Sequence, residues 1–386
     1  MKFAWPRTFW RSVFLLVLAA GVYATWIRIT GGLGASTHLS DEFPWGLWIG
    51  FDVLCGVGLA AGGFTLAAGV HIFNIRRYEP IVRPAILTAF LGYLLVIVAL
   101  LYDLGRPERI WHPLVMWNPR SVMFEVAWCV TLYTTVLFFE VFPLVLERLG
   151  QRRPLAWMHR AMIPLVVAGV ILSTLHQSSL GSLYLIVPEK LHPLWYTPWL
   201  PLLFFVSAIS VGLAMTIFES WHSSKAFGHQ LELPLLAGLG RLLAVVLLIY
   251  LTLRFRDLER RGVLGQAVEP APETWLFWLE IGLTALPMFL LFRASTRRRP
   301  RSLYWCAVMV IFGFVAHRLN VSVTGMEAAS GATYFPKWTE ISVTLAIVAL
   351  GFAAFRLAAK YLPVFEPARE AAEGPARPEV ALAAAD

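Results

Sequence analysis

The chain has 386 residues, of which 58% are hydrophobic, and it carries a net charge of +8 together with 16 tryptophans. Soluble domains contain about 45–50% apolar residues, so this composition excludes an ordinary soluble protein and indicates a membrane protein. The positive charge does not indicate a nucleic-acid partner. The Lys and Arg residues lie in short loops between apolar runs, where the positive-inside rule accounts for them.

Ten apolar stretches are long enough to span a bilayer, which needs about 20 residues of helix. They predict an all-α integral membrane protein in which helices 2–5 and 6–9 form two four-helix bundles and the remaining helices flank them. The membrane domain is expected over 1–362, and a disordered cytoplasmic tail, rich in Ala, Pro and Glu, over 363–386. The first stretch is expected to be a retained helix rather than a cleaved signal peptide. The predicted spans are 11–30, 45–74, 83–104, 120–146, 155–177, 198–221, 233–254, 274–293, 302–322 and 339–360.

Arginines concentrate in alternate loops, which predicts that both termini face the cytoplasm. The second, fourth and eighth loops carry most of them, whereas the first loop holds Asp41 and Glu42. The seventh loop departs from the rule, because four arginines fall on its outer side: Arg254, Arg256, Arg260 and Arg261.

Several ionisable residues interrupt the apolar runs at one predicted depth, within about two turns of the outer face. Such residues cost roughly 2.5–3.5 kcal/mol each on insertion scales, so they are candidates for function. A single layer of them predicts proton-coupled chemistry near the outer leaflet. The layer comprises Asp52, Asp103, Glu125, His176, Glu280 and Arg318.

The segment 102–125 is the densest in such residues. Asp103 ends the third predicted helix, and Glu125 lies just over one turn into the fourth, so the two carboxyl groups are expected to approach each other. A salt-bridged, helix-capping turn would explain Asp103 without any function. Glu125 has no local partner to explain it, because its neighbours in the sequence are apolar.

His176 closes the fifth predicted helix and, beside a carboxylate, can exchange protons near neutral pH. A capped helix end is the structural alternative, but the shared depth with Glu125 and Asp103 favours proton exchange. Tyr93 at mid-membrane and Glu219 near the cytoplasmic end of helix 6 would extend a relay across the bilayer. Alternatively, Glu219 merely reaches to the interface.

Haem and metal ligands are not expected in this chain. Cys55, Cys129 and Cys306 stand singly in apolar runs without a CxxC motif, which argues against zinc, iron–sulfur clusters and disulfides and predicts small core residues. No helix carries two histidines at the spacing of a dihaem bundle. Two pairs would be available as haem ligands at one depth, His71 with His159 and His176 with His317.

Six motifs resemble those of the polysulfide-reductase NrfD family, and within it the ten-helix HybB-type branch of hydrogenase membrane subunits. DsrP- and HmcC-type membrane subunits of sulfur metabolism share the motifs, so the branch stays open. The motifs are Pro44-Trp-Gly-Leu-Trp-Ile-Gly-Phe-Asp52, Arg83-Pro-Ala-Ile-Leu, Asp103-Leu-Gly-Arg-Pro, Ser121-Val-Met-Phe-Glu125, His176-Gln-Ser-Ser-Leu-Gly-Ser-Leu and Tyr334-Phe-Pro-Lys-Trp-Thr-Glu340.

The resemblance implies a quinone-reactive subunit of a respiratory complex in the bacterial inner membrane, without haem or cluster of its own. It would dock a periplasmic ferredoxin-like iron–sulfur subunit, which leads to a catalytic subunit, and would exchange electrons with menaquinone or ubiquinone while protons are taken up, released or translocated. The family's functional positions fall on Tyr93, Glu125, His176 and Glu219.

These considerations predict a quinone pocket between helices 2–5 near the outer face. Glu125, His176 and Asp103 are expected to bind quinone and transfer protons there, with Tyr93 and Glu219 as relay members. The alternative from another class is a proton-coupled secondary transporter, in which Glu125 and His176 would bind the coupling proton.

Overall fold

The structure is a computed structural model that describes residues 7–228 and 230–365. Within these ranges it contains helices and no β-strand, and ten helical segments are long and apolar enough to cross a membrane. The predicted all-α membrane fold is therefore confirmed. The part of the predicted tail from 366 to 386 lies outside the described residues.

Eight of the ten spans are α-helices, the first of which is kinked at Gly32. Two are composite, and both contain π-helical turns, which are frequent at functional sites. Span 2 consists of a π-helix (Trp48–Val53), α2 (Leu54–Leu59), α3 (Gly62–Ala67) and a second π-helix (Ala68–Ile72), and span 9 of α12 (Pro300–Leu319), a π-helix (Asn320–Thr324) and α13 (Gly325–Ser330). The other spans are α1 (Arg7–Ser36), α4 (Glu79–Asp103), α6 (Val122–Arg148), α7 (Arg152–Ser182), α8 (Leu200–Phe227), α9 (Leu233–Arg260), α10 (Pro272–Phe292) and α14 (Trp338–Tyr361).

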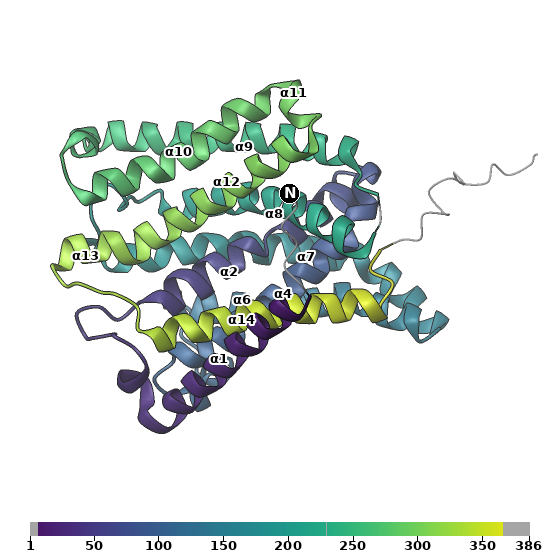
Figure 1. Cartoon of the computed structure of the whole chain (residues 1–386), viewed down its shortest axis with the longest axis horizontal. Coiled ribbons are helices and arrows are strands. Elements are labelled where there is room, and N and C mark those ends of the chain that lie inside the picture. Colours follow the sequence, from purple (N-terminus) through teal and green to yellow (C-terminus); the bar gives the residue numbers. More distant parts are fainter. Residues whose placement is uncertain (1–6, 229, 366–386) are drawn as a thin grey trace, which may run out of the picture.

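The spans assemble into two four-helix bundles, as predicted. Bundle 1 consists of span 2, α4, α6 and α7, and bundle 2 of α8, α9, α10 and span 9. The remaining helices, α1 and α14, run side by side along bundle 1, where α14 packs on α4 (Figure 1). Helix α8 also packs against span 2 and α7, so it joins the two bundles.

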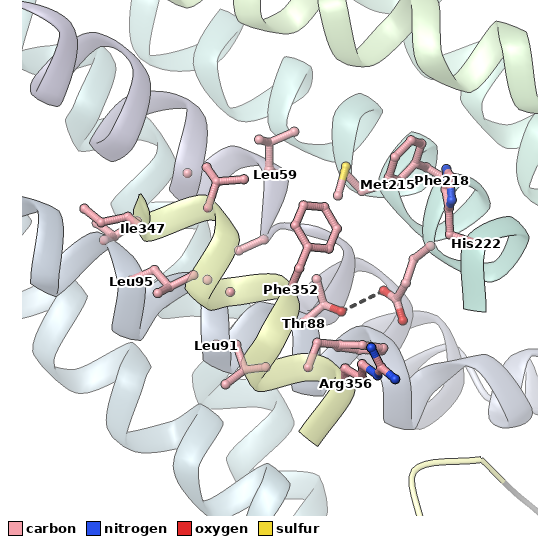
Figure 2. A pocket seen from close by; sticks show the side chains of 18 of the residues that line it. Leu59, Thr88, Leu91, Leu95, Met215, Phe218, His222, Ile347, Phe352 and Arg356 are labelled. Atoms are coloured by element: carbon pink, nitrogen blue, oxygen red, sulfur yellow. Dashed lines mark hydrogen bonds between the residues drawn. The ribbon is translucent and has the colours of Figure 1, made fainter. Parts of the chain in front are cut away.

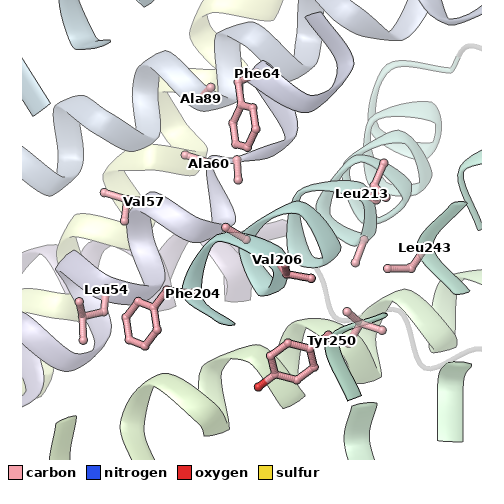
Figure 3. Close-up of a cluster of buried hydrophobic side chains, with 14 of the residues drawn as sticks. Leu54, Val57, Ala60, Phe64, Ala89, Phe204, Val206, Leu213, Leu243 and Tyr250 are labelled. Carbon is pink, nitrogen blue, oxygen red and sulfur yellow. The ribbon is translucent and has the colours of Figure 1, made fainter. Parts of the chain in front are cut away.

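Small residues allow span 2 to lie close to its neighbours. A Cβ atom on Gly212 of α8 would lie 2.7 Å from the backbone of Ala61 and Gly62, and one on Gly63 would lie 2.6 Å from Ala89 Cβ of α4. Close backbone contact through small residues is the usual means of packing helices in membranes. The glycines thus bring the backbone of span 2 close to both neighbouring helices, and the apolar core around them includes Phe64 (Figure 3).

Helix α7 is longer than predicted. It continues to Ser182 instead of ending near 177, so His176 lies inside the helix and does not close it. Within the polar run after it, Ser178 and Ser182 satisfy their hydroxyl groups inside the helix by donating to the carbonyl groups one turn earlier, at 2.8 Å and 3.3 Å.

Two of the four arginines that break the charge rule are held by acidic partners within the protein. Arg254 is buried, with Nη2 3.9 Å from Glu280 Oε1, and Arg261 pairs with Asp257 at 2.8 Å. These two side chains therefore need not reflect the orientation of the loop. The orientation of the chain itself stays a prediction; the side of the loop 104–121 is called the outer side below.

Candidate functional site

Bundle 1 contains a buried, hydrogen-bonded pair of ionisable side chains. Tyr93 Oη of α4 lies 2.8 Å from His176 Nδ1 of α7, and neither residue is exposed. Tyr133 of α6 stacks edge-on against Tyr93, with ring centroids 4.7 Å apart. Four buried polar atoms around the pair have no hydrogen-bond partner among the described residues: Tyr133 Oη, Ser173 Oγ, His176 Nε2 and Gln177 Oε1.

Glu125 lies on the outer side of this pair. Its Oε1 is 2.5 Å from Ser179 Oγ, which follows His176 by three residues on α7. Because residues three apart share a helix face, Ser179 brings the carboxyl group to the same side of α7 as the imidazole. Glu125 itself is exposed and His176 is buried.

Glu140 lies below the pair, toward the inner side of bundle 1. A Cβ atom on Gly169 of α7 would lie 3.4 Å from Glu140 Oε1 and 3.5 Å from the ring of Tyr133. Gly169, Ser173 and His176 lie on one face of α7 because they are spaced by three and four residues. From the inner to the outer side, Glu140, Tyr133 and Tyr93 lie next to this face. We call this set, with Glu125 and Ser179, the polar column; from Gly169 to Ser179 it rises about 15 Å.

A cavity of about 710 Å³ lies elsewhere, between span 2, α4, α8 and α14. Its walls are apolar, with Leu59, Leu91 and Phe352 among the lining side chains (Figure 2). Two carboxyl groups also line it, Asp52 from the π-helix of span 2 and Glu219 from α8.

Each of these carboxyl groups accepts a hydrogen bond from a threonine on another helix. Thr344 Oγ1 of α14 donates to Asp52 at 2.7 Å, and Thr88 Oγ1 of α4 donates to Glu219 at 2.8 Å (Figure 2). Asp52 lies near the outer start of span 2, whereas Glu219 lies in the inner third of α8. The cavity is therefore an apolar chamber with one carboxyl group toward each side of the membrane.

Asp103 belongs to the surroundings of Asp52 and not to those of Glu125. It lies within electrostatic range of Asp52, Arg28 and Glu340, and its Oδ1 has no hydrogen-bond partner among the described residues. Arg28 of α1 donates to the carbonyl groups of Tyr102 and Leu104, at 2.8 Å and 2.6 Å, which fixes the outer end of α4.

Residues of the motif from Tyr334 to Glu340 form hydrogen bonds at the outer end of the cavity. The Tyr334 hydroxyl donates to Glu340 at 2.5 Å and accepts from Leu47 N at 2.8 Å, while Glu340 also accepts from His38 N at 3.1 Å. Burial, followed by the adjacent Glu340 carboxylate, raises the pKa of Tyr334. The contacts tie the start of span 2 to the start of α14, on either side of the cavity.

The residues predicted to form one layer thus belong to three groups. Asp52 and Asp103 lie toward the outer end of the cavity, Glu125 and His176 in the polar column, and Glu280 and Arg318 in bundle 2. The cavity also lies outside the space between helices 2–5 where a pocket was predicted. Sequence reasoning missed Tyr133 and Ser173, although the helical spacing of 169, 173 and 176 was available as a signal.

Comparison with known proteins identifies the family. The family model described as "Polysulphide reductase, NrfD" matches residues 35–328. A protein of Nitratidesulfovibrio vulgaris is 40% identical over 359 residues, covering 90% of this chain and 92% of its own. The "Probable Ni/Fe-hydrogenase 2 b-type cytochrome subunit" of Escherichia coli is 34% identical, with 89% of each chain covered. The "Menaquinone reductase, integral membrane subunit" of N. vulgaris is 29% identical over 92% of this chain and 91% of its own.

Proposed function

Because the chain belongs to the NrfD polysulphide reductase family, we propose that it passes electrons between a periplasmic iron–sulfur subunit and the quinone pool of a bacterial inner membrane. Relatives are membrane subunits of hydrogenase and menaquinone reductase complexes, and their names support an oxidoreductase complex with a separate catalytic subunit. Menaquinone is the favoured substrate, since two relatives are named for menaquinone or menaquinol. Family membership lends no support to the alternative of a secondary transporter.

The cavity is the observation that supports this proposal most strongly. Ligand sites typically have volumes of about 300–1,000 Å³, with apolar walls and a few polar groups, and the 710 Å³ cavity meets this description. A quinone needs an apolar space for its isoprenoid tail and polar groups near its two carbonyl oxygens. We place the quinone ring toward Asp52, with Asp103 nearby, and the tail along the apolar wall of α4 and α14.

The polar column supplies proton transfer in this proposal. Reduction of a quinone to a quinol takes up two electrons and two protons, and its oxidation releases them. Gly92 of α4 lines the cavity, and the next residue, Tyr93, forms a hydrogen bond with His176 of the polar column. Helix α4 therefore lies between the cavity and the polar column. We propose that Glu125, His176 and Tyr93 exchange the protons, and that Glu219 serves the inner side. This replaces the predicted direct contact of Glu125 and His176 with the ring.

A haem, which the name of the E. coli relative implies, does not fit the residues present. His176 and His317 are enclosed in different bundles, and each uses Nδ1 in a contact, with Tyr93 Oη and Arg318 Nη1 respectively. The cavity beside His317 measures about 20 Å³, far below the size of a haem, and among the described residues His222 is the one histidine that lines the large cavity. The second pair is also unsuitable, because His159 is exposed on the surface of α7.

Photolabelling tests the position of the quinone. A photoreactive menaquinone analogue added to the purified complex should label peptides of span 2, α4, α8 and α14, and excess menaquinone should suppress the label. Labelling confined to α6 and α7 would contradict the site. Mass spectrometry of the same preparation should identify a co-purifying subunit with ferredoxin-type cysteine motifs.

A further inference from the structure

The large cavity exists because span 2 leans away from α14 along its length. The outer π-helix of this span, Trp48–Val53, packs on α14 and α4, whereas its inner π-helix, Ala68–Ile72, packs on α7. At the midpoint of the span, Gly62 lies against the backbone of α8 and Gly63 against that of α4. Below the outer π-helix the cavity therefore has α14 on one side and α8 on the other.

Contacts between helices cross both ends of the cavity. The hydrogen bonds described above tie the helices together at the outer end. At the inner end the chain that follows α14, residues 362–365, runs to α4 and α8. The carbonyl group of Pro363 accepts from Arg83 Nη1 of α4 at 3.3 Å, Val364 is buried, and the Phe365 ring lies 5.3 Å from that of Phe227, which lines the cavity on α8.

The side of the cavity between α14 and α8 has an exposed rim. Val348, Phe352 and Arg356 follow one another at four-residue spacing on α14, and all three both line the cavity and are exposed. His222 and Phe227 of α8 share these two properties. A side chain that lines a cavity and is also exposed lies where the cavity meets the surface. The cavity therefore opens sideways, between α8 and α14.

This opening lies at the level of the lipid chains. Lys225 Nζ of α8 is 4.0 Å from the centroid of the Trp221 ring, and Lys360 Nζ of α14 is 4.9 Å from that of Tyr361. Lysines and aromatic rings of this kind are typical of the membrane interface. Phe352 precedes Lys360 by eight residues, which places it about 12 Å further into the membrane. The opening at Phe352 therefore faces hydrocarbon and not water.

Phe352 is the large side chain at this opening. It is 67% exposed although it lines the cavity, and Figure 2 shows it extending from α14 toward the side formed by Met215 and Phe218 of α8. The backbone beside it is fixed, because a Cβ atom on Gly351 would lie 2.6 Å from Leu95 Cδ1 of α4. Exposed side chains change rotamer within picoseconds to nanoseconds. The ring of Phe352 can therefore move while α14 stays in place.

We propose that quinone enters the cavity sideways from the lipid, through the opening between α8 and α14, and that the side chain of Phe352 is the gate of this opening. The quinone ring passes Glu219 and then moves along α4 and α14 to Asp52, and the tail follows it through the opening. The proposal rests on the proposed function, since the cavity has to hold quinone for the opening to serve it.

Binding kinetics of the intact complex distinguish a gate from an ordinary wall residue. A fluorescence-quenching menaquinone analogue, mixed by stopped flow with the complex in lipid nanodiscs, gives separate rate constants for association and dissociation. Phe352→Trp should lower both rate constants by about fivefold or more, and Phe352→Ala should raise both, because a barrier to entry is equally a barrier to exit. The dissociation constant should change by less than about twofold, whereas a residue that merely contacts bound quinone alters chiefly the dissociation rate.

Two control variants accompany this measurement, with dye-linked activity showing that each complex is assembled. Leu350→Trp changes a residue of α14 that is 46% exposed and does not line the cavity, so both rate constants should stay at the wild-type values. Arg83→Gln removes the hydrogen bond to Pro363 and loosens the inner end. Association should be unchanged in this variant, whereas entry at the inner end would make it faster.

The proposal is overturned if the Phe352 variants associate with the analogue at the wild-type rate, if Leu350→Trp slows association as much as Phe352→Trp does, or if Arg83→Gln speeds it. In these cases binding of the analogue by the wild-type complex still supports the proposed function. A wild-type complex that binds no analogue would contradict the proposed function, and the lateral entry with it.

Discussion

The hydrogen-bond partner of Glu125 is distant in the sequence and is brought close by helix packing. Its neighbours along α6 are apolar, and its partner Ser179 lies 54 positions away on α7, at 2.5 Å. The sequence allowed the prediction that Glu125 and His176 lie at similar depth. It did not allow the prediction of Ser179, because serine is common in helices and only the packing of α6 on α7 selects this one.

Glu125→Gln should lower quinone-linked turnover by about 10²–10⁴-fold, since the amide keeps the size of the side chain but cannot transfer the proton. Electron transfer from the catalytic subunit to an artificial dye should be unchanged, which shows that the complex remains assembled. Glu147→Gln, on the same helix but paired with Arg83 at the inner end, is the matched control. Near wild-type turnover in the Glu125 variant would show that its role is structural.

The helices were predictable in number and approximate position, and their ends were less so. The polar run after His176 was expected to end a helix, but its serines satisfy their hydroxyl groups within α7. Span 9 likewise continues past its predicted end through a π-helix to Ser330. Helix ends depend on tertiary neighbours, such as Pro201 of α8 beside Gly181, which no local pattern specifies.

Gly212→Ala should destabilise the protein, because the new methyl group would lie 2.7 Å from the backbone of span 2 and would force the two bundles apart. Gly282→Ala is the control, since a Cβ atom at this helical position meets no atom within 4 Å. That change should be neutral or stabilising by up to about 1 kcal/mol. Thermal denaturation of the purified complex measures both. Equal melting temperatures for the two variants would contradict the close contact between span 2 and α8.

At the scale of the whole molecule, the ten spans and the two bundles followed from hydropathy and from short connections between successive helices. The cavity did not, because it forms between span 2 and α4 on one hand and α8 and α14 on the other, which lie far along the sequence from the first two. The ionisable residues predicted to lie in one layer were interpreted as one site, because the sequence does not show which helices pack together. In the structure these residues belong to three separate groups. The sequence predicts the depth of a residue along its helix. It does not predict the neighbouring helix toward which the side chain points.

The purified complex should show no haem b signal assignable to this chain. The expectation rests on the candidate haem ligands, since His176 and His317 are buried and committed to other contacts and His159 is exposed. A reduced-minus-oxidised spectrum of the purified complex is the measurement. A sharp band near about 560 nm at stoichiometric haem would reverse the conclusion.

The central claim is that quinone occupies the cavity between span 2, α4, α8 and α14. Leu91→Trp tests it most directly, because Leu91 lines the cavity and the larger side chain would occupy part of the space along α4 where the quinone tail is placed (Figure 2). Leu94→Trp, three residues further on the same helix, is the control, since Leu94 is exposed and does not line the cavity. Titration of a quinone analogue onto the assembled complex should show an affinity at least about tenfold lower, or 1.4 kcal/mol, for Leu91→Trp and an unchanged affinity for Leu94→Trp. Wild-type affinity in the Leu91 variant, with dye-linked activity intact in both, would contradict the claim.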